Sequence, residues 1–301
     1  MSTQAKVSVI GHSIAAAVVI ALMGIASVYD LQISRAIGDP NSFFGQFFAI
    51  YAEYPSYMVA PLCATVLFYN ADRATTRTWQ IAARIGAAVL CYGGYVVFGL
   101  MSTKLVEVPH QTAFAFVASG LYAAITLALG KCISRETMHR LLRFAVFALA
   151  FLLVALAVIR LMKFGWCRMR YRDMLKEGNF DGFTPWYIPM LGREKLSDAY
   201  SYTSFPSGHS SSIVHLFLIT VLCDILPCMR KPAVRYICYG GCIVLTVLAC
   251  VSRIVNCAHF LSDVVAGASI TYVIFYILKR IFFPPQVLQR YNTESDPKGA
   301  I

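Results

Sequence analysis

Long apolar stretches recur along the chain and are separated by shorter polar segments. Eight of them are candidate elements, at residues 7–29, 57–70, 80–101, 111–130, 144–162, 210–226, 236–251 and 260–278. A helix needs about 20 predominantly apolar residues to cross the hydrocarbon core of a bilayer. The pattern therefore predicts an all-α fold, a polytopic membrane helix bundle of about eight spans.

The first two stretches differ from the rest. Residues 7–29 carry no charge, exceed the usual apolar region of a signal peptide and lack a clear cleavage site, so we expect an uncleaved first span. Residues 57–70 are short, are interrupted by Pro61, and follow Glu53 and Pro55. Without this stretch the count is seven spans, and the predicted sidedness reverses.

Two connecting segments stand out, the polar and aromatic residues 30–56 and the longer residues 163–209, which are rich in Arg, Asp, Gly, Pro and aromatic side chains. A connection as long as the second is usually functional or disordered, and its aromatic residues suit a membrane–water interface. We therefore expect three regions. These are N-terminal spans with their loops (1–143), a membrane core that holds the functional loop (144–283), and a flexible C-terminal tail (284–301).

The composition supports a membrane location. Hydrophobic residues make up 58% of the chain and charged residues 14%, against about 25% charged residues in soluble domains. This balance excludes a disordered chain, a coiled coil and an ordinary nucleic-acid-binding module, and it disfavours a soluble enzyme. The ten cysteines lie mostly in apolar runs without a CxxC pair, which indicates buried thiols rather than a disulfide framework.

The net charge of +11 is better explained by topology than by a nucleic-acid partner. Eight spans place both termini on one side, which then holds 15 of the 26 basic residues but only five of the 15 acidic ones. Basic residues in short loops mark the cytoplasmic face. We therefore expect the long loop at 163–209 to be extracytoplasmic, in a plasma membrane, and the absence of an N-x-Ser/Thr sequon favours a bacterial one.

Reactive residues concentrate in three segments that this topology brings to one membrane face: 163–170, 204–209 and 252–263. They include three cations, Lys163, Arg170 and Arg253. Charges at a membrane boundary are costly unless paired, and the planar fork of arginine suits phosphate oxygens. Ser207 and Gly208 precede a predicted helix, where backbone N–H groups can point at an anion. These residues indicate a phosphate-binding site.

Two histidines and an aspartate add candidate catalytic groups. His259 and Asp263 are four residues apart and therefore share one helical face. The carboxylate can hold one imidazole nitrogen and leave the other free as a nucleophile. His209 is a second imidazole, suited to giving and taking protons near neutrality. Together these groups match a phosphomonoester hydrolase that works through a phosphohistidine.

The motifs also resemble a known family. Lys-x6-Arg from Lys163, Pro-Ser-Gly-His ending at His209, and Ser-Arg-x5-His-x3-Asp ending at Asp263 are similar to the three-part signature of the type 2 phosphatidic acid phosphatase superfamily. That superfamily includes lipid phosphate phosphatases and vanadate-dependent haloperoxidases. The resemblance begins at Lys163 and extends into the eighth predicted span. The first four predicted spans carry no recognised motif.

The resemblance implies roles for these residues. His259 would attack phosphorus with Asp263 orienting it, and His209 would protonate the leaving alkoxide and then activate water. The phosphate oxygens would be held by five residues: Lys163, Arg170, Arg253, Ser207 and Gly208. The resemblance implies no metal and no other cofactor. The first motif departs from the family pattern, because Tyr171 follows Arg170 where proline is usual, and this leaves Arg168 and Arg172 as neighbouring alternatives.

Structural roles are expected for several other residues. Arg168, Arg172 and Lys176 are interpreted as a solvated or headgroup-facing patch, and Ser262 as structural. Asp263 at a span entrance has the alternative role of a helix N-cap. The spacing of Cys257, His259 and Asp263 matches no strong zinc pattern.

The expected function is an integral-membrane phosphatase that hydrolyses phosphomonoester or pyrophosphate groups of membrane lipids. Two alternatives remain open, a lipid phosphotransferase and a non-catalytic lipid-phosphate binder or transporter. The expected partners are the bilayer and a lipid phosphate substrate, with no nucleic acid. The sequence leaves open which lipid is the substrate and which oligomeric state the protein adopts.

Overall fold

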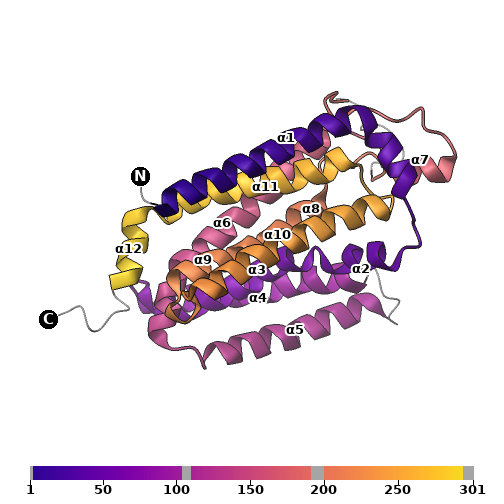
Figure 1. Ribbon diagram of the computed structural model, residues 1–301. Coiled ribbons are helices and arrows are strands. Elements are labelled where there is room, and N and C mark those ends of the chain that lie inside the picture. The colour runs from indigo at the N-terminus through magenta and orange to yellow at the C-terminus, as the bar shows by residue number, and fades with distance from the viewer. Residues whose placement is uncertain (1–2, 104–109, 191–199, 294–301) are drawn as a thin grey trace. The chain divides into compact units, whose positions relative to one another are not determined.

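The structure is a computed structural model that describes residues 3–103, 110–190 and 200–293. In these ranges the regular structure is helical, with no strand (Figure 1). The α-helices are α1 (Thr3–Ile37), α2 (Phe43–Tyr51), α3 (Tyr54–Tyr69), α4 (Arg77–Thr103), α5 (Gln111–Gly130), α6 (Arg135–Trp166), α7 (Tyr171–Glu177), α8 (Gly208–Ile213), α9 (Leu218–Ile225), α10 (Pro232–Val255), α11 (Leu261–Phe282) and α12 (Pro285–Thr293). The predicted all-α class is confirmed.

Within the described residues, seven helical segments are long and apolar enough to cross a membrane. They are Ile10–Ile37, Arg77–Ser102, Gln111–Gly130, Arg135–Glu177, Gly208–Ile225, Pro232–Val255 and Leu261–Phe282. The protein is therefore a multi-pass membrane protein. The remaining predicted stretch forms α3, which has 16 residues with Pro61 inside it and is not among the seven.

Two segments without an apolar pattern, the connection at 30–56 and the expected tail at 284–301, contain helices. The segment 30–56 begins inside α1, which continues to Ile37, and it also contains α2. The expected tail begins with α12, while residues 294–301 lie outside the described part of the chain. Asp30 in the first segment and Arg290 in the second therefore lie on helices.

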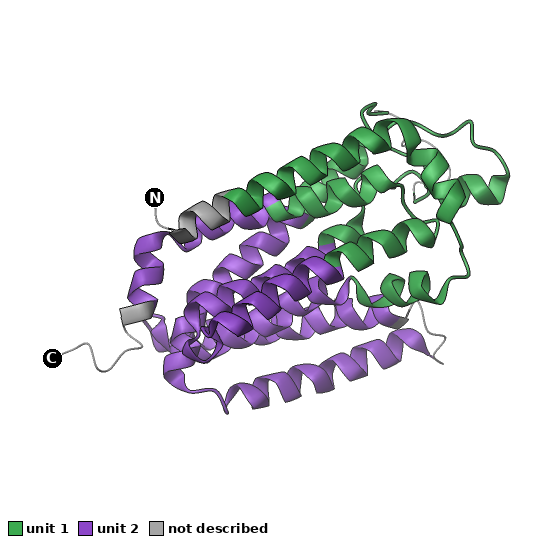
Figure 2. Cartoon of the chain, viewed as in Figure 1, with its two compact units in different colours: residues 1–52, 156–211, 246–272 green, residues 53–155, 212–245, 273–301 purple. Residues whose placement is uncertain are grey.

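The chain divides into two compact units, shown in Figure 2. Unit 1 comprises residues 1–52, 156–211 and 246–272, and unit 2 comprises residues 53–155, 212–245 and 273–301. Neither unit is continuous in sequence, because α6, α8, α10 and α11 each contribute residues to both.

Two apolar clusters of described residues lie within unit 1. In the first, Ile254 at the end of α10 and Val264 near the start of α11 pack with side chains of α1 that include Leu22 and Ile33. The second cluster joins the segment that contains α7 to the connection between α10 and α11. Its buried members are Met169, Tyr171, Met174, Cys257 and Phe260, and Phe180 and Phe183 pack against them. The aromatic side chains of the long loop thus form part of a core.

Unit 2 contains α3, α4 and α5, which pack in sequence order. Their shared core includes Ala64, Cys91, Tyr95 and Ala123. The small side chains of Ala64, Cys91 and Ala123 let the helices approach closely, as is common in membrane helix packing.

A close approach in unit 1 fixes the turn before α8 against α11. The Ser207 backbone N–H donates to the Asp263 carbonyl oxygen at 2.9 Å. A Cβ at Gly267, one turn further along α11, would clash with the backbone of Ser207. Glycine at position 267 therefore allows the turn to lie directly on the helix.

We expect Gly267→Ala to destabilise the protein by about 1–3 kcal/mol, the usual cost of overpacking a tight contact. Gly24→Ala on α1 is the matched control, because a Cβ there meets no atom within 4 Å and alanine is favoured by about 0.5–1 kcal/mol in a helix. Thermal unfolding in detergent measures both changes. Equal midpoints for the two variants would contradict the close approach.

Candidate active site

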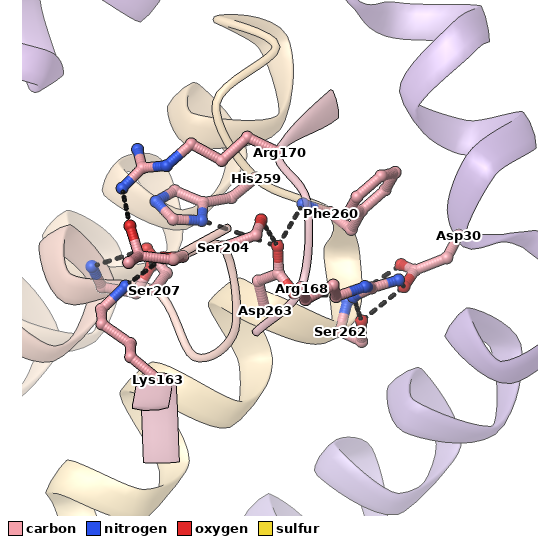
Figure 3. A network of polar contacts seen from close by, with 12 residues as sticks. Asp30, Lys163, Arg168, Arg170, Ser204, Ser207, His259, Phe260, Ser262 and Asp263 are labelled. Carbon is pink, nitrogen blue, oxygen red and sulfur yellow. Dashed lines mark hydrogen bonds and ion pairs between the residues drawn. The ribbon is translucent and has the colours of Figure 1, made fainter. Parts of the chain in front are cut away.

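The eight residues predicted to form the site all belong to unit 1. Lys163 and Arg170 flank the end of α6, and Ser207, Gly208 and His209 form the turn into α8. Arg253, His259 and Asp263 extend from the last turn of α10 into the first turn of α11. Figure 3 shows the polar contacts around Asp263 and His259.

Asp263 both caps α11 and faces His259. Its Oδ2 atom accepts a hydrogen bond from the Phe260 backbone N–H at 2.9 Å and another from the Ser204 hydroxyl at 2.5 Å. The same oxygen lies 3.6 Å from Nδ1 of His259, slightly beyond the usual hydrogen-bond range of about 2.7–3.2 Å. The two roles considered for Asp263, helix cap and histidine partner, are therefore compatible in one geometry.

His259 is held in the short connection between α10 and α11. Its backbone N–H and that of Ala258 both donate to the Arg253 carbonyl oxygen, at 3.2 and 3.0 Å. The imidazole is 1% exposed. Burial, together with the nearby charges of Arg170 and Lys163, lowers the pKa of His259 to about 3, although the contact with Asp263 opposes the shift. The ring is therefore neutral near pH 7, the form that a nucleophile requires.

The two cations of the first motif are anchored on Thr203. Lys163 Nζ donates to the Thr203 carbonyl oxygen at 2.6 Å, and Arg170 Nη2 donates to its hydroxyl at 2.9 Å. The Arg170 guanidinium also lies over the Tyr200 ring, 4.2 Å from its centroid. Arg170 is buried, so its charge acts with little screening by water. Neither Thr203 nor Tyr200 was predicted from the sequence.

The turn that contains Ser207 differs in one respect from the expectation. The Ser207 backbone N–H is used by the Asp263 carbonyl oxygen, so it does not point at an anion. Its hydroxyl oxygen accepts from the Ser210 hydroxyl at 3.2 Å, and a serine hydroxyl retains its own proton to donate. Any contact of Ser207 with phosphate would therefore come from the side chain.

His209 is held by a backbone group outside the three motifs. Its Nε2 atom lies 3.2 Å from the carbonyl oxygen of Ala49 on α2. Because a carbonyl oxygen can only accept, Nε2 carries a proton in this contact. Arg253, His259 and Arg170 all act electrostatically on His209. The structure thus gathers the second and third motifs and the arginine of the first.

Arg168 corrects a prediction, because it does not belong to a solvated patch. Its side chain is 1% exposed, and Nη1 donates to Asp263 Oδ1 at 2.6 Å while Nη2 donates to Asp30 Oδ2 at 2.9 Å. Further bonds run from Nη1 to the Ser262 hydroxyl and from Nε to the Thr184 carbonyl oxygen. The guanidinium also lies 4.3 Å from the centroid of the Phe260 ring.

Asp30 is the functional candidate that the sequence missed. It lies on α1 and is 2% exposed. One carboxylate oxygen accepts from the Ser262 backbone N–H at 3.0 Å, and the other accepts from the Ser262 hydroxyl and from Arg168. Asp30 and Asp263 therefore share one guanidinium, as Figure 3 shows. The available signal was a carboxylate directly after 23 uncharged positions.

The neighbouring basic residues of α7 are more exposed. Arg172 and Lys176 each lie 3.8 Å from Asp173, with side-chain exposures of 31% and 76%. Among the residues that the structure describes, no group of three or more His, Cys, Asp or Glu side chains is arranged to hold a metal ion.

Fold and site together define a multi-pass membrane protein with a histidine–carboxylate pair beside buried cations. The family model of the PAP2 superfamily matches residues 144–286, and this part of the chain belongs to that superfamily. All three motifs fall inside the match, whereas Asp30 and Ala49 lie before it. Neither the curated proteins nor the solved structures searched for similarity gave a match.

Replacing Arg168 with methionine should leave two buried carboxylates without their cation. Breaking a buried ion pair in this way costs about 3–5 kcal/mol. Arg172→Met, which removes a partly exposed arginine four residues away, should cost at most about 1 kcal/mol. Unfolding of both variants in detergent measures the difference, and similar losses would show that Arg168 does not hold the network.

Proposed function

We propose that the protein is an integral-membrane phosphatase that hydrolyses the phosphomonoester or pyrophosphate group of a membrane lipid through a phosphohistidine. Membership of the PAP2 superfamily supports a phosphatase-type function. The observation that carries the proposal is the neutral, buried His259 with Asp263 on its Nδ1 side and with Lys163 and Arg170 close enough to act on its charge.

In the first step, Nε2 of His259 attacks phosphorus and the bond from phosphorus to the lipid oxygen breaks. Asp263, which faces Nδ1, stabilises the imidazolium that develops. The leaving oxygen departs with the bonding electrons and takes a proton from Nδ1 of His209, which enters this step as an imidazolium and keeps its Nε2 proton on the Ala49 carbonyl oxygen. Lys163, Arg170 and Arg253 stabilise the negative charge on the phosphate oxygens, with Ser207 and Gly208 at the turn into α8.

In the second step, His209 accepts a proton from water, and the resulting hydroxide attacks phosphorus. The bond between phosphorus and Nε2 breaks, which releases phosphate and restores neutral His259. Both steps need only side chains of this chain, so we propose that the activity is independent of added metal.

A lipid substrate is favoured by the surroundings of the motifs. The protein has seven apolar spans among its described residues. Large apolar side chains beside the motifs, Phe164, Tyr187 and Ile188, are exposed and suit contact with an amphiphile. The count of seven spans reverses the side of the motifs relative to the N-terminus, but the basic segments 131–143, 230–235 and 279–298 remain across the membrane from the motifs. From this distribution of basic residues we propose an extracytoplasmic active site in a plasma membrane.

The chemistry is tested with purified protein, EDTA and a panel of phosphatidate, a prenyl pyrophosphate and a sphingoid phosphate. We expect phosphate release by the wild type and a loss of about a thousandfold or more in His259→Ala, because removing a nucleophile abolishes its pathway. His110→Asn, at an exposed histidine with a left-handed backbone, is the control and should remain active.

Other outcomes point to the alternatives. Labelled phosphate that appears in an added acceptor lipid rather than in solution would indicate a phosphotransferase. Binding without turnover would indicate a binder or transporter, and strict dependence on a divalent metal would contradict the proposed chemistry.

The side of the membrane on which the active site lies can be tested by labelling cysteines. All ten are free, and the exposed ones are Cys132 and Cys228, both on the predicted cytoplasmic side. An Asp181→Cys variant adds a thiol at an exposed position of the long loop. A membrane-impermeant maleimide should label this variant in intact cells and label the wild type only after permeabilisation. The reverse pattern would place the active site in the cytoplasm.

A further inference from the structure

A basic cavity lies within unit 2, apart from the residues of the proposed chemistry. It has a volume of about 440 Å³, and its polar lining comes from α6 (Glu136, His139, Arg140, Arg143) and α12 (Arg290, Tyr291). This volume lies within the range of about 300–1,000 Å³ that is usual for small-ligand sites.

Helical spacing explains why these side chains converge. The four α6 residues follow the spacing of three and four that places side chains on one helical face. Arg290 and Tyr291 are likewise three and four residues after Val287, which completes the lining on α12. The cavity therefore lies between two ordered helical faces rather than in an irregular loop.

Specific contacts hold α12 in place. The Tyr291 hydroxyl donates to the Arg140 carbonyl oxygen at 3.1 Å, and Arg230 Nη2 donates to the Tyr291 carbonyl oxygen at 2.6 Å. The Tyr291 ring also lies 6.4 Å from the ring of Phe283, measured between centroids. The wall formed by α12 is thus anchored at both its backbone and its side chains.

The charge of the cavity is strongly positive. Three arginines face one carboxylate, that of Glu136, which Arg140 engages at 3.0 Å. Arg143 donates from Nη1 to the Phe282 carbonyl oxygen at 3.2 Å, and a guanidinium has five N–H donors in all. His139 is oriented by a contact of 2.7 Å between its Nδ1 and Asn70 Oδ1. An anion in the cavity would relieve the repulsion among the arginines.

We propose that this cavity binds a phosphate-bearing anion. Arginine forks match phosphate oxygens in pairs, and Arg143 and Arg290, both exposed, approach the cavity from different helices. The lining arginines belong to the group that the charge distribution predicts to be cytoplasmic, where anionic lipid headgroups are concentrated. Two kinds of ligand carry such a phosphate group, an anionic phospholipid and a soluble phosphate ester.

The experiment compares the wild type with Arg143→Gln/Arg290→Gln in nanodiscs. One arm compares phosphatidylcholine with the same lipid plus phosphatidylglycerol, whose phosphodiester is not the group that the proposed hydrolysis consumes. The second arm adds glycerol 3-phosphate to phosphatidylcholine nanodiscs. Thermal midpoints and native mass spectrometry report binding in both arms. Because the catalytic residues are identical in all variants, binding at the proposed active site contributes equally.

We expect the double variant to lose affinity by about tenfold or more, since each arginine supplies charge-assisted hydrogen bonds. Arg77→Gln/Arg84→Gln is the matched control, because it removes two exposed arginines of α4 that do not line the cavity. If the double variant loses affinity only in the phosphatidylglycerol arm, the ligand is a lipid headgroup. If it loses affinity for glycerol 3-phosphate, the ligand is a soluble phosphate ester.

The proposal fails if wild type and double variant respond alike in both arms, or if the control loses as much affinity. Should the double variant not fold, Arg290→Gln alone tests the same site with a smaller expected loss. Arg143→Lys keeps the charge but removes the fork, and it should bind with intermediate affinity. None of these outcomes depends on whether the protein hydrolyses a lipid phosphate.

Discussion

The buried guanidinium of Arg168 is the contact on which the candidate active site depends. It pairs at once with Asp30 and Asp263, two carboxylates that would repel each other and would be too costly to bury alone. Asp263 is also fixed by Ser204 and by the Phe260 backbone, and it faces His259. The orientation of the proposed nucleophile therefore rests on a cation that belongs to the interior of unit 1.

The surroundings of His259 and Asp263 differ in a way that suits their proposed roles. Arg168 supplies a cation directly to Asp263, whereas burial and the charges of Arg170 and Lys163 keep His259 neutral. Cations near a neutral imidazole leave its lone pair available and at the same time favour an incoming phosphate. One set of positive charges thus serves both the nucleophile and the group that it is proposed to attack.

The sequence predicted the helical class and most spans because a helix that crosses a bilayer needs a long run of apolar residues, and such runs can be read directly from the sequence. It also predicted that His209, His259 and Asp263 come together, because their motifs fall at span ends on one face. It did not predict the burial of Arg168, since an arginine in a polar loop normally meets water. It also did not predict the contact of His209 with Ala49, because any residue type can supply a backbone carbonyl oxygen. The helix α12 was not predicted because its residues show no apolar pattern.

The position of Asp30 on α1 bears on how this protein could have changed over time. Residues 144–286 carry the family match, yet Arg168 within them shares its charge with a carboxylate from the first helix. An exchange of the N-terminal helix for one without an acidic residue at that position would leave the guanidinium with one of its two carboxylates, Asp263. The arginine and the distant aspartate are therefore expected to be retained together or replaced together.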